Sequence, residues 1–169
     1  MISIKAVNLF CFDFDGVLTN NKVYLDQNGK EQVMCDRSDG IAFDALRKLN
    51  KKIYIVSTEK NNVVKKRAKK LKINVLNGVK NKGNALGEIS RKEGIPLDNA
   101  IFIGNDINDI GAMQLCKYSA CPSDSHSKVK SISKIKLKSK GGDGIVRELL
   151  ERHFRIDLQS LLYNGNSKG

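Results

Sequence analysis

An apolar run that ends in two carboxylates constrains this chain more than any other feature. Residues 7–12 lead directly into Asp13-Phe14-Asp15-Gly16, so both acids stand at the carboxyl end of a predicted buried strand. That edge is where open α/β sheets bind their ligands. Residues i and i+2 of an extended segment point the same way, so the two carboxylates lie close together. Two like charges at such a short distance are costly unless a cation or a shared proton compensates them. We therefore expect a carboxylate site that holds Mg²⁺, a hard cation that prefers oxygen ligands.

Apolar runs and helical periodicities alternate along the rest of the chain. Strands are predicted at 5–12, 53–56, 73–76 and 100–104, with short edge strands at 118–121 and 135–137. Helices are predicted at 38–49, 63–71, 82–93 and 145–153. This alternation is typical of an α/β fold with a doubly wound, Rossmann-like parallel sheet. Asn28-Gly29 lies between two short apolar runs and predicts a β-hairpin, a small flap over the acidic pair.

Length and composition indicate a single globular unit. The 169 residues suffice to bury a hydrophobic core. We expect one domain over 1–164, a flexible tail at 165–169 and no large cap domain. No apolar stretch approaches the ~20 residues that cross a bilayer, and no signal peptide is recognised, so no membrane partner is expected. The four cysteines form no CxxC pair, which favours reduced thiols and a cytoplasmic protein.

The formal net charge of +12 raises the alternative of a protein that binds nucleic acid. The lysines are scattered, however, and no aromatic residues alternate with them, as stacking on single strands would require. We interpret them mainly as a solvated surface, and we expect no nucleic-acid partner. A basic surface would also attract a phosphorylated, acidic substrate.

Polar side chains follow each of the four predicted buried strands. In chain order they are Asp13 and Asp15, Ser57 and Thr58, Lys82, and finally Asn105, Asp106 and Asp109. The carboxyl ends of parallel strands meet at one edge, which would unite a nucleophile, an acid–base group, a hydroxyl, a cation and metal ligands. Phosphoryl transfer needs this mixture because its chemistry is mostly positioning and charge neutralisation.

The order of these groups resembles the four motifs of the haloacid dehalogenase superfamily of phosphohydrolases. The matching positions are residues 13–19, Ser57, Lys82 and residues 104–109. The resemblance covers nearly the whole chain, and four motifs in order are far more specific than an isolated DxDG. It implies a phosphomonoesterase with Mg²⁺ as its cofactor. Asn105 departs from the pattern, since an aspartate is common there, and a neutral amide suggests that it orients Asp106 or a metal-bound water.

This resemblance implies a role for each motif residue. Asp13 attacks phosphorus and becomes an aspartyl phosphate, which divides one hard hydrolysis into two easier steps. Asp15 protonates the leaving alcohol and then activates water as a general base. Ser57 and Lys82 hold phosphate oxygens, with Lys82 acting as a point charge. The implied ligands of Mg²⁺ are Asp13, the backbone carbonyl of Asp15, Asp106 and Asp109.

Within the superfamily, the chain is most similar to small capless phosphatases that act on 3-deoxy-2-ulosonates, the eight- and nine-carbon keto-acid sugars. The cues are the hairpin, Arg37 with Asp39-Gly40, Arg67-Ala68, and the glycine-rich 141–144 followed by Val146-Arg147-Glu148. The similarity implies a homotetramer. The hairpin and C-terminal tail of each subunit would cover a neighbour's site in place of a cap and exclude water from it.

The second motif bears on the substrate. Ser57-Thr58-Glu59-Lys60 stands where phosphatases of 3-deoxy-D-manno-octulosonate 8-phosphate usually show Thr-Gly-Arg. An acidic residue at that place is typical of relatives acting on nine-carbon, acylneuraminate-like 9-phosphates, so the comparison slightly favours a nine-carbon substrate. The expected substrate contacts are Thr58, Arg37, Asp39, Glu59, Arg67 and Lys70. Simpler interpretations remain, namely a surface ion pair or helix cap for Arg37 and Asp39, and a solvated helix face for Glu59, Arg67 and Lys70.

Two other classes of function remain open. One is a non-catalytic, oligomerising module that assembles with a sugar cytidylyltransferase, because residues 57–61 also resemble phosphatase modules fused to such enzymes. The complete set of motifs argues against a module that has lost its activity. The other is the basic nucleic-acid-binding protein considered above.

We predict an Mg²⁺-dependent phosphomonoesterase that acts on a phosphorylated ulosonic acid.

Overall fold

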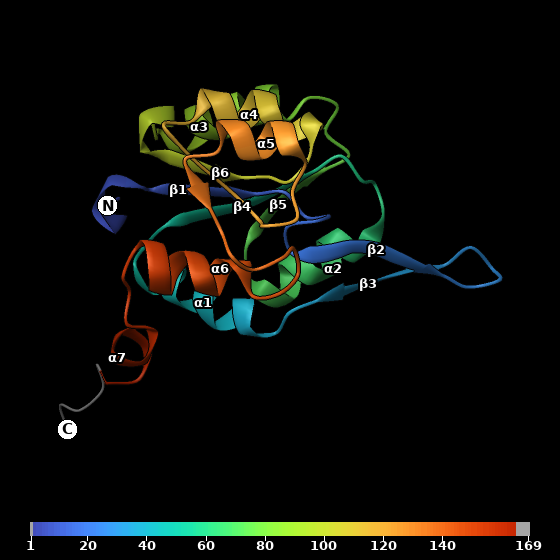
Figure 1. Ribbon diagram of the computed structural model, residues 1–169, viewed down its shortest axis with the longest axis horizontal. Coiled ribbons are helices and arrows are strands. Elements are labelled where there is room, and N and C mark those ends of the chain that lie inside the picture. Colours follow the sequence, from blue (N-terminus) through green and yellow to red (C-terminus); the bar gives the residue numbers. More distant parts are fainter. Residues whose placement is uncertain (1, 165–169) are drawn as a thin grey trace.

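A six-stranded parallel sheet forms the centre of the fold (Figure 1). This computed structural model describes residues 2–164. The strand order is β5-β4-β1-β6-β7-β8, and every neighbouring pair is parallel. The strands are β1 (Leu9–Phe12), β4 (Lys52–Ser57), β5 (Asn74–Asn77), β6 (Ala100–Ile103), β7 (Tyr118–Cys121) and β8 (Ile135–Lys136). The predicted doubly wound α/β fold is confirmed.

Helices cover both faces of the sheet (Figure 1). One face carries α1 (Ser38–Lys48), α2 (Asn62–Leu71) and α6 (Ile145–Glu148), with α7 (Leu158–Leu162) packed against α1. The other carries α3 (Lys82–Glu93), α4 (Ile110–Leu115) and α5 (Ser127–Ile132). Side chains alternate along each strand, so β1 sends Phe10 and Phe12 into the first core and Leu9 and Cys11 into the second. All four strand residues are therefore buried, which explains the continuous apolar run.

The strand order places β1 where the chain reverses direction across the sheet. From β1 the chain adds β4 and β5 on one side, and it then returns to add β6, β7 and β8 on the other. The loops that follow β1 and β6 therefore leave neighbouring strands, and a ligand crevice forms between such loops in open α/β sheets. Asp13 and Asn105 follow these two strands.

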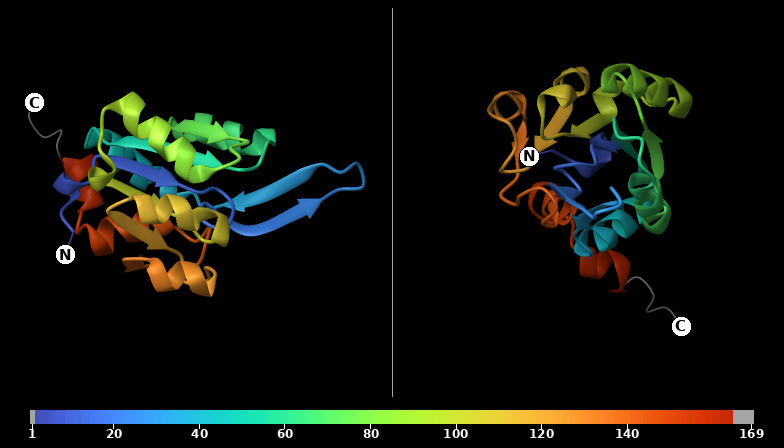
Figure 2. Two further views of the ribbon diagram at one scale, coloured as in Figure 1. Left: turned by 90° about the horizontal axis from the view of Figure 1, so that it is seen from above. Right: turned by 90° about the vertical axis from the view of Figure 1, so that its right-hand side faces the viewer.

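The predicted hairpin consists of β2 (Thr19–Leu25) and β3 (Glu31–Cys35), and it projects from the body as a narrow arm (Figure 2). Its turn is closed by the Asp26 carboxylate, which accepts from the backbone N–H groups of Asn28 and Lys30. Within residues 2–164 there is no larger cap domain. The arm leaves Val23, Tyr24, Leu25 and Met34 each more than half exposed.

Several predicted boundaries were wrong. The strand predicted at 5–12 is shorter, because the Ser3 hydroxyl accepts from the Lys5 N–H and begins a 3-10 turn, η1 (Ile4–Ala6). The helix predicted at 145–153 exists, but α6 passes into a π-helical turn, η4 (Leu149–His153). The short helices α4, α5 and α7 were not predicted. The flexible tail predicted at 165–169 lies outside the described residues.

None of the helices in the described part of the chain is long and apolar enough to span a membrane. The four cysteines are free thiols, as predicted.

Candidate active site

A buried lysine joins two carboxylates at the carboxyl edge of the sheet. Lys82 Nζ lies 2.6 Å from Asp13 Oδ1 and 2.7 Å from Asp109 Oδ1. All three side chains are buried. The three residues follow β1, β5 and β6, so the structure unites the ends of strands that are distant in sequence. Lys82 begins α3, where the Asn81 side chain accepts from the Asn84 N–H and fixes the first turn.

The charges of this buried group depend on one another. Burial raises the pKa of Asp13, and the Asp109 carboxylate raises it further, while Lys82 opposes both. Burial alone would lower the pKa of Lys82, but the two carboxylates outweigh it and raise that pKa. Removing one partner of such a buried group leaves an uncompensated charge, which is strongly destabilising. The ammonium of Lys82 therefore holds the Asp13 carboxylate in place.

The turn after β6 is built around Asp109. Its Oδ2 accepts from the backbone N–H groups of Asn105 (2.8 Å) and Asp106 (3.2 Å), while Oδ1 contacts Lys82. A β-carbon at Gly104 would lie 2.5 Å from Asp109 Cβ, so only glycine permits this close approach. Both carboxylate oxygens of Asp109 are thus engaged by protein groups. Asp106 is exposed, and its carboxylate accepts from the Ile107 N–H at the start of η3 (Ile107–Asp109).

Asn105 completes a cluster of oxygen atoms that the sequence did not predict. Its amide oxygen faces Asp13 Oδ2 and the backbone carbonyl of Asp15, with separations of 3.2 and 2.9 Å. An amide turned the other way would donate to the same two atoms, so the cluster suits either an NH₂ group or a cation. Neighbouring oxygen ligands of an octahedral Mg²⁺, each ~2.1 Å from the ion, lie about 3 Å apart. One carboxylate, one carbonyl and one amide oxygen therefore fit Mg²⁺.

The predicted set of metal ligands is thus only partly assembled. Asp13 and the Asp15 carbonyl lie in the oxygen cluster, whereas Asp109 is committed to Lys82 and two backbone amides. Within residues 2–164, no three Asp, Glu, His or Cys side chains converge on a possible metal position. The sequence predicted another role for Asn105, namely that its neutral amide orients Asp106 or a metal-bound water, although an amide oxygen is also a ligand for hard cations.

A pocket of about 200 Å³ opens beside Asp15. It extends toward the base of the hairpin and the loop after β4, and it is lined by Asp15, Asn21, Val23, Glu31, Val33, Glu59 and Asn61. Burial raises the pKa of Asp15, and the Glu59 carboxylate raises it further. This shift favours the acid form, which is the form that can donate a proton.

Two residues of the second predicted motif lie near this pocket. Ser57 is the buried last residue of β4, next to β1, and its hydroxyl oxygen accepts from the Glu59 N–H. Its O–H is therefore free to donate to a phosphate oxygen. Thr58 is exposed on the loop that follows. Glu31 and Asn61, which sequence reasoning missed, join the hairpin to this loop through a hydrogen bond of 3.2 Å.

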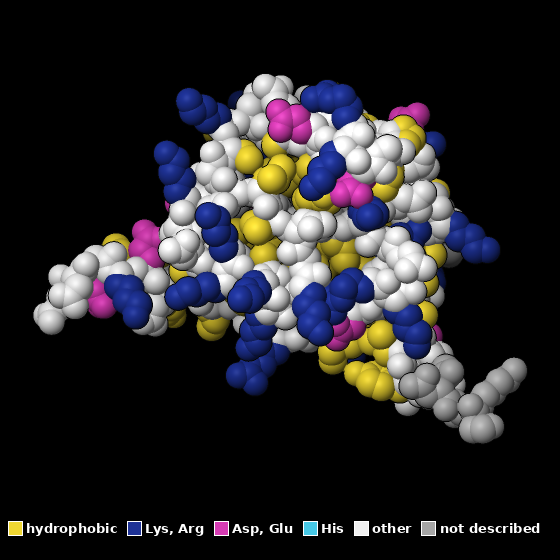
Figure 3. Space-filling view, turned by 180° about the vertical axis from the view of Figure 1, so that it is seen from behind, with side chains coloured by type: hydrophobic (Ala, Val, Ile, Leu, Met, Phe, Trp, Pro, Cys, Tyr) yellow, Lys and Arg dark blue, Asp and Glu magenta, His cyan; other side chains and the backbone are white. Residues whose placement is uncertain are grey.

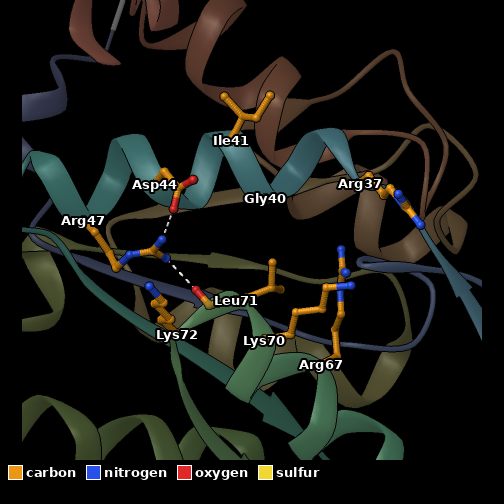
Figure 4. Close-up of a pocket in the computed structure, with 9 residues that line it drawn as sticks. All are labelled: Arg37, Gly40, Ile41, Asp44, Arg47, Arg67, Lys70, Leu71 and Lys72. Atoms are coloured by element: carbon orange, nitrogen blue, oxygen red, sulfur yellow. Dashed lines mark hydrogen bonds and ion pairs between the residues drawn. The ribbon is translucent and has the colours of Figure 1, made fainter. Parts of the chain in front are cut away.

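Three other predicted substrate residues, Arg37, Arg67 and Lys70, line a basic pocket of about 440 Å³ between α1 and α2 (Figure 4). Its lining is Arg37, Gly40, Ile41, Asp44, Arg47, Arg67, Lys70, Leu71 and Lys72. Arg37, Arg67 and Lys70 approach one another at one end (Figure 4). Arg67 donates to the Asp36 carbonyl at 2.7 Å, and its Nε is buried without a hydrogen-bond partner.

Asp39 lies elsewhere, buried beneath α6. Its Oδ1 accepts from the backbone N–H groups of Val146 (2.9 Å) and Arg147 (3.2 Å). The interpretation of Asp39 as a cap of its own helix was wrong, because it lies inside α1 and its carboxylate accepts from amides of α6 instead. Burial raises the pKa of Asp39 to about 7, against the effect of the two N–H groups.

Fold and site together define a class of protein. A doubly wound sheet carries a buried aspartate, a lysine paired with it and a second acid at one edge, and this mixture of charges suits phosphoryl transfer. The chain belongs to the haloacid dehalogenase-like hydrolases, because the model of that family matches residues 42–149. The resemblance seen in the sequence is confirmed.

Several known proteins are similar over most of their length. The 3-deoxy-D-manno-octulosonate 8-phosphate phosphatase KdsC of Salmonella typhi is 26% identical over 152 residues, which cover 89% of this chain and 81% of that protein. A HAD family hydrolase from Streptomyces avermitilis is 34% identical, with a TM-score of 0.87 and coverage of 89% and 87%. The 3-deoxy-D-manno-octulosonate 8-phosphate phosphatase of Moraxella catarrhalis, solved with magnesium, phosphate and KDO, is 26% identical, with a TM-score of 0.85 and coverage of 94% and 88%. The predicted phosphomonoesterase agrees with the family and with these relatives.

The buried carboxyl of Asp39 predicts a pH-dependent stability. Its folded pKa of about 7 exceeds the unfolded value of about 3.9. The folded state therefore binds the proton more tightly, and the free energy of unfolding should fall as pH rises from about 4 to about 7. Asp39→Asn cannot ionise yet keeps an oxygen acceptor for α6, so this part of the decline should disappear. Urea unfolding across this pH range measures the effect, with exposed Asp143→Asn as the control. An unchanged pH profile in Asp39→Asn would contradict the prediction.

Proposed function

We propose that this chain is an Mg²⁺-dependent phosphatase that hydrolyses the phosphate monoester of a 3-deoxy-2-ulosonic acid through an aspartyl phosphate at Asp13. The observation that carries the proposal is the buried Asp13–Lys82–Asp109 group beside the oxygen cluster and Asp15. A fixed carboxylate, a positive charge and the nearby carboxyl group of Asp15 support the proposal, because phosphoryl transfer depends on positioning and charge neutralisation.

The reaction divides into two displacements at phosphorus. A carboxylate oxygen of Asp13 forms a bond to phosphorus while the bond to the sugar oxygen breaks, and Asp15 gives its proton to the departing alcohol. Asp15, now a carboxylate, takes a proton from water as the water oxygen attacks the same phosphorus. The phosphorus–Asp13 bond breaks, which releases inorganic phosphate and restores both acids. Ser57 and Lys82 donate to the phosphoryl oxygens in both steps.

The residues that would hold Mg²⁺ are Asp13, the backbone carbonyl of Asp15 and Asn105. When bound, the ion neutralises negative charge on the carboxylate and the phosphoryl group. Asp106 is exposed at the start of η3, where its carboxylate accepts from the Ile107 N–H, and the side-chain amide of Asn105 lies against Asp13 Oδ2 and the Asp15 carbonyl. Asp109 supports the cluster indirectly by fixing the backbone of Asn105.

The basic pocket supplies recognition of an acidic sugar. Guanidinium groups bind carboxylates in a planar, bidentate manner, and the buried Nε of Arg67 has no hydrogen-bond partner among residues 2–164. Arg67 donates to the carbonyl of Asp36, the residue that follows β3, so the basic pocket reaches the base of the hairpin. We infer that Arg37, Arg67 and Lys70 bind the sugar carboxylate. Basic side chains also extend from much of the rear face (Figure 3), which would attract an anionic substrate.

Two substrates fit this class. The named relatives favour 3-deoxy-D-manno-octulosonate 8-phosphate. Glu59 favours a nine-carbon 9-phosphate, because it lines the pocket beside Asp15, where its carboxylate would accept from additional hydroxyl or amide groups of a longer sugar. A parallel assay of both phosphates separates these candidates.

Replacement of the nucleophile tests the mechanism. Asp13→Asn should lower turnover by about a thousandfold or more, while circular dichroism shows a folded protein, because the amide keeps the shape of the side chain but is a poor nucleophile. EDTA should abolish wild-type activity and added Mg²⁺ should restore it. Full turnover in Asp13→Asn, or in EDTA, would refute the proposal.

The basic pocket is tested by a pair of adjacent lysines. Lys70 lines the pocket, whereas Lys69 is exposed and does not. Lys70→Ala should raise KM for the ulosonate phosphate about tenfold, since it loses a hydrogen bond between charged groups. It should leave hydrolysis of p-nitrophenyl phosphate unchanged, because that ester lacks a carboxylate. Lys69→Ala serves as the control, and equal KM values in both variants would exclude carboxylate binding in the pocket.

We further propose that the hairpin joins subunits in a homotetramer, because Val23 and Leu25 on one face of β2 and Tyr24 on the other are each more than half exposed. Light scattering should give the mass of a tetramer for the wild type and a smaller species for Leu25→Asp. Lys22→Asp, on the same strand, controls for the added charge. A fully active wild-type monomer would contradict shared sites.

A further inference from the structure

The loop between β8 and α6 carries a glycine pair that packs directly against residues 14–20. These residues follow Asp13 and are called the catalytic loop below. Gly141 and Gly142 are buried, and the Gly142 N–H donates to the Val17 carbonyl at 3.0 Å. A β-carbon at Gly141 would overlap the Gly16 carbonyl oxygen. One at Gly142 would lie 2.6 Å from the Asn20 backbone nitrogen. These neighbours are backbone atoms, so any side chain here would displace the catalytic loop.

The catalytic loop is enclosed from the opposite side as well. A β-carbon at Gly16 would overlap the side-chain amide of Asn105. Gly16 is therefore sandwiched between Asn105 and Gly141, and neither neighbour leaves space for a side chain. The carbonyl of Asp15, an oxygen of the cluster, belongs to the peptide that leads into Gly16. Its position is consequently set by both contacts.

The glycine pair is itself anchored away from the catalytic loop. Asp124, on the loop after β7, accepts from the Gly141 N–H at 3.0 Å. The Ser123 N–H donates to the Ser139 carbonyl at 2.9 Å. At the far end, Asp39 holds the first amides of α6. The loop cannot retreat from the catalytic loop without breaking these bonds.

We propose that Gly141 and Gly142 form a backbone clamp that sets the position of the Asp15 carbonyl, and that Asp124 is the positioning residue that holds the clamp. The contacts of the clamp do not depend on the proposed function. Its role in metal binding and catalysis rests on that proposed function. It explains why a glycine-rich segment follows β8 without any assumption about a neighbouring subunit.

An alanine substitution at Gly141 tests the close contact with the catalytic loop without adding backbone strain. Gly141 does not have a positive φ, so Gly141→Ala adds only contacts with the backbone of Gly16 and Thr19. Gly111→Ala is the matched control, because its φ is also not positive and nothing lies within 4 Å of its β-carbon. Isothermal titration should show Mg²⁺ affinity about tenfold weaker in Gly141→Ala, as found when groups supporting metal ligands are lost. Gly111→Ala should bind as the wild type does.

Asp124 provides a second test should Gly141→Ala fail to fold. Asp124→Asn keeps an oxygen that accepts from the Gly141 N–H, whereas Asp124→Ala does not. Amide hydrogen exchange over residues 14–20, measured without metal or substrate, should be faster in Asp124→Ala and close to wild type in Asp124→Asn. Exchange that is unchanged in Asp124→Ala would overturn the clamp. If the two variants show this exchange pattern but the wild-type protein has no phosphatase activity, only the proposed function is overturned.

Discussion

The ammonium of Lys82, buried between the carboxylates of Asp13 and Asp109, is the interaction on which the rest of the site depends. A buried charge of either sign is costly unless it is paired and hydrogen-bonded. Here one cation satisfies an acid at the end of β1 and another after β6. The second oxygen of Asp109 then fixes the backbone of Asn105 and Asp106. The contacts that compensate these buried charges therefore also fix the geometry of the crevice.

The consequences extend to both sides of the catalytic loop. On one side, the fixed backbone of Asn105 directs its amide toward Asp13 and the Asp15 carbonyl. On the other, Gly141 and Gly142 lie against Gly16 and the residues that follow it. The carboxylate of Asp15 is less confined and faces the pocket that also contains Glu31 and Glu59. The proposed nucleophile is thus held rigidly, while the proposed proton donor borders the space for the leaving group.

Much of this arrangement could be predicted, because it follows from a short-range pattern. A buried apolar strand that ends in polar residues marks its own carboxyl end, and parallel strands bring such ends together. That reasoning located Asp13, Ser57, Lys82 and Asp109 correctly at one edge.

The errors have physical causes as well. Asp39 and Val146 are 107 residues apart, and no local pattern reveals that one caps the other's helix. The orientation of the Asn105 amide depends on atoms of Asp13 and Asp15 that only the folded structure brings near it. Short helices such as α5 offer too few residues for a clear periodicity. The glycine-rich segment that contains Gly141 and Gly142 was noted in the sequence, but its contacts with a loop more than a hundred residues away were not predicted.

Trapping the covalent intermediate tests the central claim most directly. Borohydride reduces an acyl phosphate to an alcohol, so an aspartyl phosphate becomes homoserine, which peptide mass spectrometry locates within the chain. The account predicts homoserine at position 13 when the enzyme is quenched during turnover of an ulosonate phosphate, and none without substrate. Modification at another residue, or turnover with position 13 unmodified throughout, would contradict it.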